Sequence, residues 1–101
     1  MRRLIRSAQS DEDLIAIWRY VAIKNPEAAT HLLRYLDNRI RSLIVHSFMG
    51  ERQPQFGDTT RRLVVGSYLV FYDVLPDAVQ VLRVFHSARK IEDLLAESQD
   101  A

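Results

Sequence analysis

The chain has 101 residues, 48% hydrophobic and 27% charged, with a formal net charge of +1 at pH 7. This composition is typical of one folded domain over residues 1–101, and its charge alone implies neither a nucleic-acid nor a membrane partner. No apolar run approaches the ~20 residues that span a bilayer, and the N-terminus lacks the apolar stretch of a signal peptide. The chain contains no cysteine, which excludes disulfides and thiol catalysis and fits a reducing cytoplasm.

The N-terminal part predicts a short strand and then a helix. A strand over residues 2–6 would place Arg3 and Ile5 on one face and Leu4 and Arg6 on the other, which suits a short strand at the margin of a sheet. Ser10 is positioned to cap the helix, with Asp13 three residues later. We expect Trp18 to pack in the core and Tyr20 to be exposed. The apolar stripe of the helix consists of Leu14, Ile17, Trp18 and Val21.

A second helix is predicted to begin at Asn25 and Pro26. The residue before a proline disfavours helical geometry, while asparagine is a good N-cap and proline a good first helical residue. The helix is predicted to continue to about Phe48, and Gly50 closes it. Because the hinge is short, the two helices should form an antiparallel hairpin. The second apolar stripe consists of Ala29, Leu32, Leu33, Leu36, Ile40, Leu43 and Ile44.

The C-terminal half predicts a polar loop at residues 51–58, three strands and a last helix. The turn dipeptides Gly66-Ser67 and Pro76-Asp77 connect the strands, and such short connections force an antiparallel meander. The strands span residues 60–65, 68–75 and 78–85, and the helix spans about residues 88–97. The order β-α-α-β-β-β-α predicts an α+β fold, with an antiparallel sheet packed against the N-terminal helical hairpin and a C-terminal helix.

Polar residues at the end of the last predicted strand form the first candidate site. Arg83 lies in the strand, His86 at its end, and Arg89 and Lys90 just beyond. Function often lies where strands end. Strand alternation places Arg83 with Phe85 on one face and His86 on the other, unless the strand ends or bulges first.

Three interpretations of this cluster stay open. It contacts a protein partner, or it cleaves RNA, with His86 moving a proton and the arginines holding the phosphate. In the third interpretation Arg83 pairs with a neighbouring-strand carboxylate such as Asp73, while His86 caps the turn. Arg61 and Arg62 open an adjacent strand and would either join Arg83 in a cationic patch or remain solvated edge residues.

A metal site is not expected. His31 and His46 are 15 positions apart in the predicted second helix, which separates them by about 22 Å at the helical rise. No cysteine is present to complete a site.

Four segments together, in order and spacing, resemble the ParE toxins of the RelE/ParE superfamily, the toxin half of bacterial toxin–antitoxin pairs. They lie at residues 13–22, 25–29, 63–72 and 81–89, the last of which is VLRVFHSAR. The resemblance covers residues 4–95 and includes the β-α-α-β-β-β-α order. The chain has no tyrosine after Tyr72, so it lacks the late tyrosine of many RelE-type ribonucleases.

The resemblance implies a cytoplasmic, cofactor-free toxin that traps DNA gyrase on cleaved DNA by binding it, without bond-making chemistry of its own. It also implies a hetero-oligomeric complex with a ParD-like antitoxin, a ribbon-helix-helix DNA-binding protein. We expect no membrane partner and no sequence-specific DNA binding by this chain alone. One alternative is a RelE-like, ribosome-dependent messenger RNA endoribonuclease that uses His86, Arg83 and Arg89. The other is a non-toxic relative that only binds its antitoxin.

The residues expected to contact the target or the antitoxin combine the basic cluster with several apolar and aromatic side chains. They are Arg61, Arg62, Arg83, His86, Arg89, Lys90, Tyr20, Ile91, Leu94 and Leu95. The last three stand at helical spacing, so they either pack on the sheet or contact the antitoxin.

Overall fold

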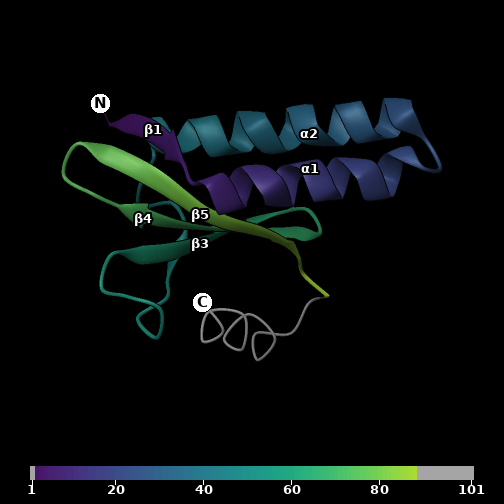
Figure 1. The fold of residues 1–101 in the computed structure, drawn as a ribbon. Helices are drawn as coiled ribbons and strands as arrows, with labels where there is room; N and C mark the ends of the chain where they lie inside the picture. Colours follow the sequence, from purple (N-terminus) through teal and green to yellow (C-terminus); the bar gives the residue numbers. More distant parts are fainter. Residues whose placement is uncertain (1, 89–101) are drawn as a thin grey trace.

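The chain folds as a helical hairpin on one face of a sheet, and the computed structural model describes residues 2–88 (Figure 1). The elements within that range are β1 (Arg3–Arg6), α1 (Ala8–Ala22), α2 (Pro26–Arg41), the 3-10 helix η1 (Ser42–Ile44), β2 (Glu51–Arg52), β3 (Thr60–Val65), β4 (Tyr68–Val74) and β5 (Ala78–His86). The strands form one sheet in the order β1-β5-β4-β3-β2. The predicted α+β class and the antiparallel β3–β4–β5 meander are confirmed.

The sheet is mixed, so the prediction of a purely antiparallel sheet is wrong for its first strand. β1 runs parallel to β5, with Arg3 opposite Ala78 and Arg6 opposite Val81. Parallel neighbours need a long crossover, which the helical hairpin and the strands after it provide. The predicted loop at residues 51–58 also contains a short strand, because β2 pairs antiparallel with β3.

The main core lies between the hairpin and the sheet. Leu36 and Ile40 of α2 and Leu43 of η1 are fully buried there against one face of the strands. The sheet contributes Leu63, Val65, Val70, Tyr72, Val74, Val79, Val81 and Val84. A smaller cluster on the opposite face centres on Phe71 and Phe85. The two clusters follow from strand alternation, which sends successive side chains to opposite faces.

Helix α1 begins three residues earlier than predicted. Its N-cap is Ser7, whose side chain accepts a hydrogen bond from the Ser10 backbone N–H, and Ser10 lies buried inside the helix. The expected Ser10 cap is therefore wrong. The start of α2 is as predicted, because the Asn25 side chain caps it by accepting from Ala28 N–H and Pro26 is its first residue.

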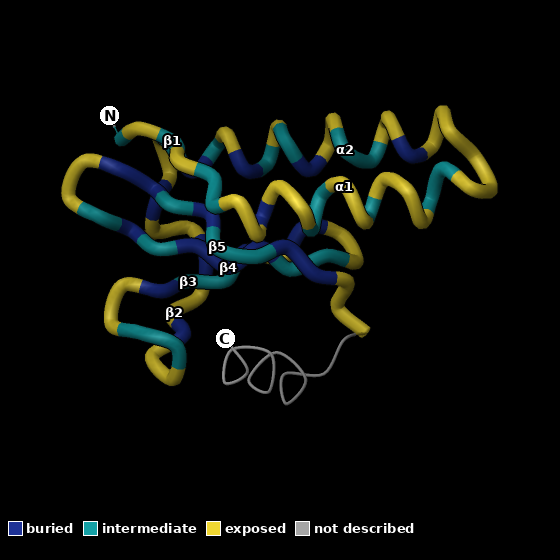
Figure 2. The backbone as a smooth tube through the Cα atoms, in the orientation of Figure 1, coloured by how far each residue is buried: buried dark blue, intermediate teal, exposed yellow. Residues whose placement is uncertain are grey.

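The core position predicted for Trp18 is wrong, because 38% of this residue is exposed. Figure 2 shows exposed residues along much of α1 and at the tip of the hairpin. Only a narrow stripe of α1, including Leu14 and Ile17, packs against the core. Tyr20 is 79% exposed, which confirms its prediction.

Helix α2 ends at Arg41, well before the predicted end near Phe48. The chain continues through η1 and a short irregular segment in which Phe48 is 59% exposed. The predicted C-terminal helix at residues 88–97 lies outside the described residues, except Ala88, which is part of a turn. Among the helices of residues 2–88, none is long and apolar enough to cross a membrane.

Asp37 links α2 to β1. Its carboxylate accepts hydrogen bonds from Arg6 on β1 and from Arg41 Nε, the latter at 2.8 Å. Burial alone would raise the pKa of Asp37, but the Arg41 hydrogen bond and the Arg6 charge outweigh it. The pKa therefore lies below its ordinary value of 3.8. A lowered carboxyl pKa stabilises the fold above the unfolded-state pKa, and the stabilisation disappears as pH falls through the folded-state pKa.

We therefore expect Asp37→Asn to reduce the free energy of unfolding at about pH 7, and to reduce it less at about pH 2, because protonation of Asp37 weakens its ion pairs. Urea unfolding at the two pH values measures this difference. The exposed loop variant Asp58→Asn is the control and should change stability little at either pH. An Asp37→Asn deficit that is independent of pH would show that its ion pairs do not cause it.

Candidate partner-binding surface

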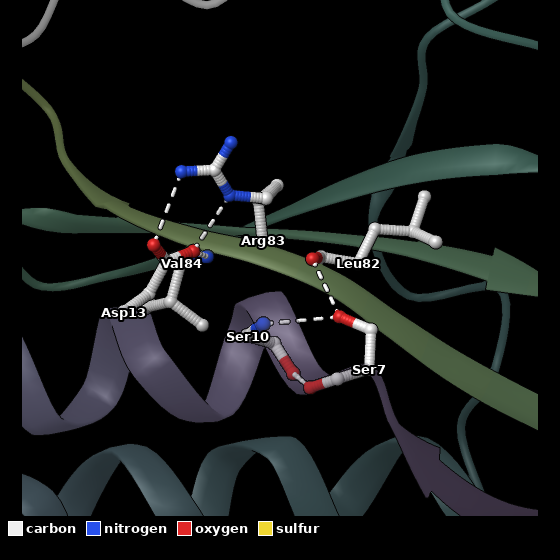
Figure 3. Close-up of polar contacts among 6 residues, drawn as sticks. All are labelled: Ser7, Ser10, Asp13, Leu82, Arg83 and Val84. Atoms are coloured by element: carbon white, nitrogen blue, oxygen red, sulfur yellow. Dashed lines mark hydrogen bonds and ion pairs between the residues drawn. The ribbon is translucent and has the colours of Figure 1, made fainter. Parts of the chain in front are cut away.

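The first turns of α1 seal the free edge of β5 beyond the end of β1 (Figure 3). Ser7 donates its backbone N–H to Val81 O at 3.0 Å and its hydroxyl to Leu82 O at 2.9 Å. Further along the helix, the Asp13 carboxylate accepts the Val84 N–H at 2.9 Å. An unpaired strand edge is able to pair with a strand of another chain. Ser7 and Asp13 bond the backbone groups of β5 that β1 does not reach, and so they protect this edge as β1 protects the part before it.

Arg83 is held by the same carboxylate. Its Nε donates to Asp13 Oδ2 at 2.8 Å and its Nη2 to Oδ1 at 3.1 Å, a two-point contact. The Arg83 guanidinium also lies 4.3 Å from the centroid of the Phe85 ring, as strand alternation predicts. The predicted Asp73 partner is wrong, because Asp73 accepts from Thr60 and Thr59 instead.

Arg62 and Arg83 flank Phe71 in one row across the sheet. Phe71 pairs in register with Arg62 on β3 and with Arg83 on β5. Arg62 forms an ion pair with Glu51 at 3.2 Å. The predicted cationic patch is therefore partly assembled on the face away from the helices, and both of its arginines contact carboxylates.

Arg61 does not belong to this row. Its side chain follows the opposite face of β3, where it donates to the carbonyl oxygens of Phe48 and Gly50 at 3.2 and 2.7 Å. Because successive side chains of a strand point to opposite faces of the sheet, Arg61 and Arg62 are predicted to lie on opposite faces.

His86 and Tyr68 face each other beside α1. Their ring centroids are 5.3 Å apart, with an angle of 82° between the ring planes. The Ala88 N–H donates to His86 Nδ1 at 3.1 Å, so His86 caps the turn. Burial, and then the neighbouring Tyr20, raise the pKa of Tyr68, which keeps its hydroxyl neutral near pH 7.

A largely apolar hollow lies between α1 and this ring pair. Within the described part of the chain, it is lined by Ala16, Ile17, Tyr20, Tyr68, His86 and Ala88. It offers aromatic surface, a phenol and an imidazole, which suit an apolar or aromatic side chain of another protein. No arginine of residues 2–88 lines it. Arg83 and His86 of the predicted ribonuclease site do not meet at this hollow, because Arg83 lies with Phe85 on the other face of the sheet.

Five of the predicted contact residues lie outside the described residues. They are Arg89, Lys90, Ile91, Leu94 and Leu95. Sequence reasoning also missed the position of Tyr68 beside His86. A regular hairpin around the Pro76-Asp77 turn would place Tyr68 opposite Phe85, but a register shift in β5 places it opposite His86. Such bulges are common beside functional sites, and no local sequence signal announced this one.

Comparison with known proteins identifies the family. Residues 4–91 match the profile described as ParE toxin of type II toxin–antitoxin system, parDE. The chain belongs to the ParE toxin family. The resemblance noted in the sequence is thereby confirmed, and the protein is a toxin of a type II toxin–antitoxin system.

Two relatives of this ParE-family toxin extend the comparison. The toxin RelE3 of Caulobacter vibrioides is 29% identical over 94 residues, which cover 89% of this chain and 99% of that protein. A solved structure described as the chromosomal ParDE TA system from P. aeruginosa matches with a TM-score of 0.72 and 22% identity. The match covers 85% of this chain and 96% of that chain. At that identity the structural match shows the shared fold.

Proposed function

We propose that this ParE-family toxin inhibits DNA gyrase in the cytoplasm, and that a ParD-like antitoxin neutralises it by forming a hetero-oligomeric complex. The family assignment supports both parts. The observation that favours binding over catalysis is the hollow of Tyr20, Tyr68 and His86. Within residues 2–88 it presents aromatic and apolar groups without an arginine, which suits a protein side chain better than a phosphate.

The decisive experiment combines purified toxin with gyrase, ATP and supercoiled plasmid, and scores linear DNA after detergent and protease. Toxin-dependent linear DNA that the antitoxin abolishes is the expected result. Because aromatic anchors often dominate a protein interface, Tyr20→Ala and His86→Ala should each reduce the yield of linear DNA by about tenfold or more.

The matched control is Tyr35→Ala, which removes an exposed tyrosine on α2 that does not line the hollow. It should retain the yield of the unmodified toxin. Circular dichroism establishes that all three variants are folded. If folded Tyr20→Ala and His86→Ala variants gave the same yield of linear DNA as the unmodified toxin, the hollow would not contact gyrase. If a folded toxin that is toxic in cells gave no linear DNA, gyrase inhibition itself would be contradicted.

A ribosome-dependent endoribonuclease is the second candidate. The contact of Tyr68 with His86 favours it, because these side chains are able to exchange protons with a substrate, and the relative from Caulobacter carries a RelE name. Messenger RNA in a translating extract would then be cut by the toxin and spared by His86→Gln, while plasmid supercoiling by gyrase stayed unchanged.

A further inference from the structure

Helix α1 carries a second row of residues on a side that does not pack against the core. The core side of α1 includes Leu14 and Ile17, whereas Ile15 is 50% exposed and Trp18 is 38% exposed. Figure 2 shows exposed residues along much of this helix. The members of the second row are exposed or half-buried, and we define them together as the outer seam: Ala8, Asp11, Ile15, Trp18 and Ala22.

The outer seam has the spacing of a coiled-coil contact. Positions 8, 11, 15, 18 and 22 are separated by 3, 4, 3 and 4 residues, the alternation that places the a and d positions of heptads along one side of a helix. Ala8 and Ala22 at the two ends are small, so a facing helix is able to approach closely. Because the fold already holds α1 as a helix, pairing through the seam does not have to order its backbone.

The charges beside the outer seam select the orientation of a second α1 helix. Glu12 and Arg19 are both exposed, and each directly follows a d position of the seam, which makes them e positions. A two-fold axis between positions 15 and 16 exchanges positions 12 and 19. In an antiparallel pair of α1 helices, Glu12 of each copy therefore lies beside Arg19 of the other, and e-position charges of opposite sign favour such pairing.

These charges are not paired within the described chain. The ion pairs among residues 2–88 join Arg6 and Arg41 to Asp37, Arg62 to Glu51 and Arg83 to Asp13, so none includes Asp11, Glu12 or Arg19. Asp11 also favours the antiparallel orientation, because in a parallel pair it would lie against Asp11 of the other copy. The helix dipole favours an acid in the first turn and a cation in the last, but it does not account for the exposed Trp18 between them.

We propose that the outer seam binds the outer seam of a second copy of this chain, with the two α1 helices antiparallel. Ile15 and Trp18 of both copies pack in the middle, and Glu12–Arg19 ion pairs flank them. A contact between two single helices is smaller than the ~1,600 Å² of a standard interface, so the dimer is weak and depends on protein concentration. Tyr20 lies about 200° around the helix from Trp18, so the dimer leaves the hollow of Tyr20 open. The inference is independent of gyrase inhibition.

Trp18 reports the contact directly, because it is the one tryptophan of the chain and belongs to the seam. As the full-length toxin is concentrated from about 1 to about 500 μM, sedimentation equilibrium should show its mass rising from 11.7 kDa toward twice that value, and the Trp18 emission should shift to shorter wavelengths. Ile15→Ala should raise the dissociation constant of the dimer about tenfold or more. The matched control is Ile23→Ala, an exposed apolar residue beyond the seam, which should leave that constant unchanged.

Exchange of the charges tests the orientation. Glu12→Arg and Arg19→Glu each create like-charge neighbours on both sides of the seam and should raise the dissociation constant about fivefold or more. The variant that carries both changes should regain the dissociation constant of the unmodified toxin. Circular dichroism establishes that every variant is folded.

Three results would overturn the proposal. The first is a mass of 11.7 kDa with an unchanged Trp18 emission over the whole concentration range. The second is a dimer that Ile15→Ala does not weaken, because the contact would then lie on another surface. The third is a dimer that the combined charge exchange weakens as much as either single change, because the two helices would then not be antiparallel.

Discussion

Replacement of Asp13 by alanine should reduce the free energy of unfolding by about 3 kcal/mol, near the lower end for breaking a buried ion pair. The Asp13 side chain is only 10% exposed and accepts from both Arg83 and the Val84 N–H. Its loss removes the acceptor of the Val84 N–H and of two hydrogen bonds from Arg83, at a position that is poorly hydrated. Urea unfolding of the purified toxin measures the change.

Glu12→Ala is the matched control for Asp13→Ala, because Glu12 is the preceding residue on α1 and is exposed. Its effect should stay within about 0.5 kcal/mol. In a double-mutant cycle, Asp13→Ala and Arg83→Ala should show a coupling energy of about 1 kcal/mol or more. Additive effects of the two changes would contradict an energetic link between the first helix and β5.

Gly50→Ala should also destabilise the fold by about 3 kcal/mol, because there is no space for a methyl group. A Cβ at this position would lie 2.6 Å from the Tyr72 hydroxyl oxygen and 2.8 Å from the Arg62 carbonyl oxygen. The first contact involves a buried hydroxyl that already bonds Gly50 and Ser47, and the second involves the backbone of β3. Thermal and urea unfolding measure the effect.

Gly66→Ala separates this crowding from the general effect of losing a glycine. Gly66 has φ +58°, which strains an alanine, but the nearest atom to a Cβ there is 3.9 Å away. This variant should lose about 1 kcal/mol. If Gly50→Ala lost no more stability than Gly66→Ala, the segment before β2 would be able to move away from Tyr72, and the predicted clash would be wrong.

The surface predicted from the sequence was found only in part. Arg62 and Arg83 do share a face, as alternation along strands requires, and His86 caps its turn. Their partners were not predictable, because the carboxylate that holds Arg83 is 70 positions away in the chain. The second helix is predicted to continue to about Phe48, but it ends at Arg41 and the Phe48 ring is exposed.

By itself, the sequence determined the elements whose signals lie within a few residues. Asn25 and Pro26 divide the two helices, and Gly66 turns the chain between β3 and β4, because capping and left-handed geometry depend on the local backbone. The four segments that resemble ParE toxins are equally local, and the family they indicated is confirmed.

Only the tertiary structure decided how these elements meet. In the folded chain β1 lies parallel to β5. Ser7, and not Ser10, caps α1, because Ser7 also donates hydrogen bonds to the backbone of β5. Trp18 is exposed because only a narrow stripe of α1 packs against the core. Each outcome depends on packing and hydrogen bonds between distant segments, whose free energies outweigh local preference and leave no local pattern in the sequence.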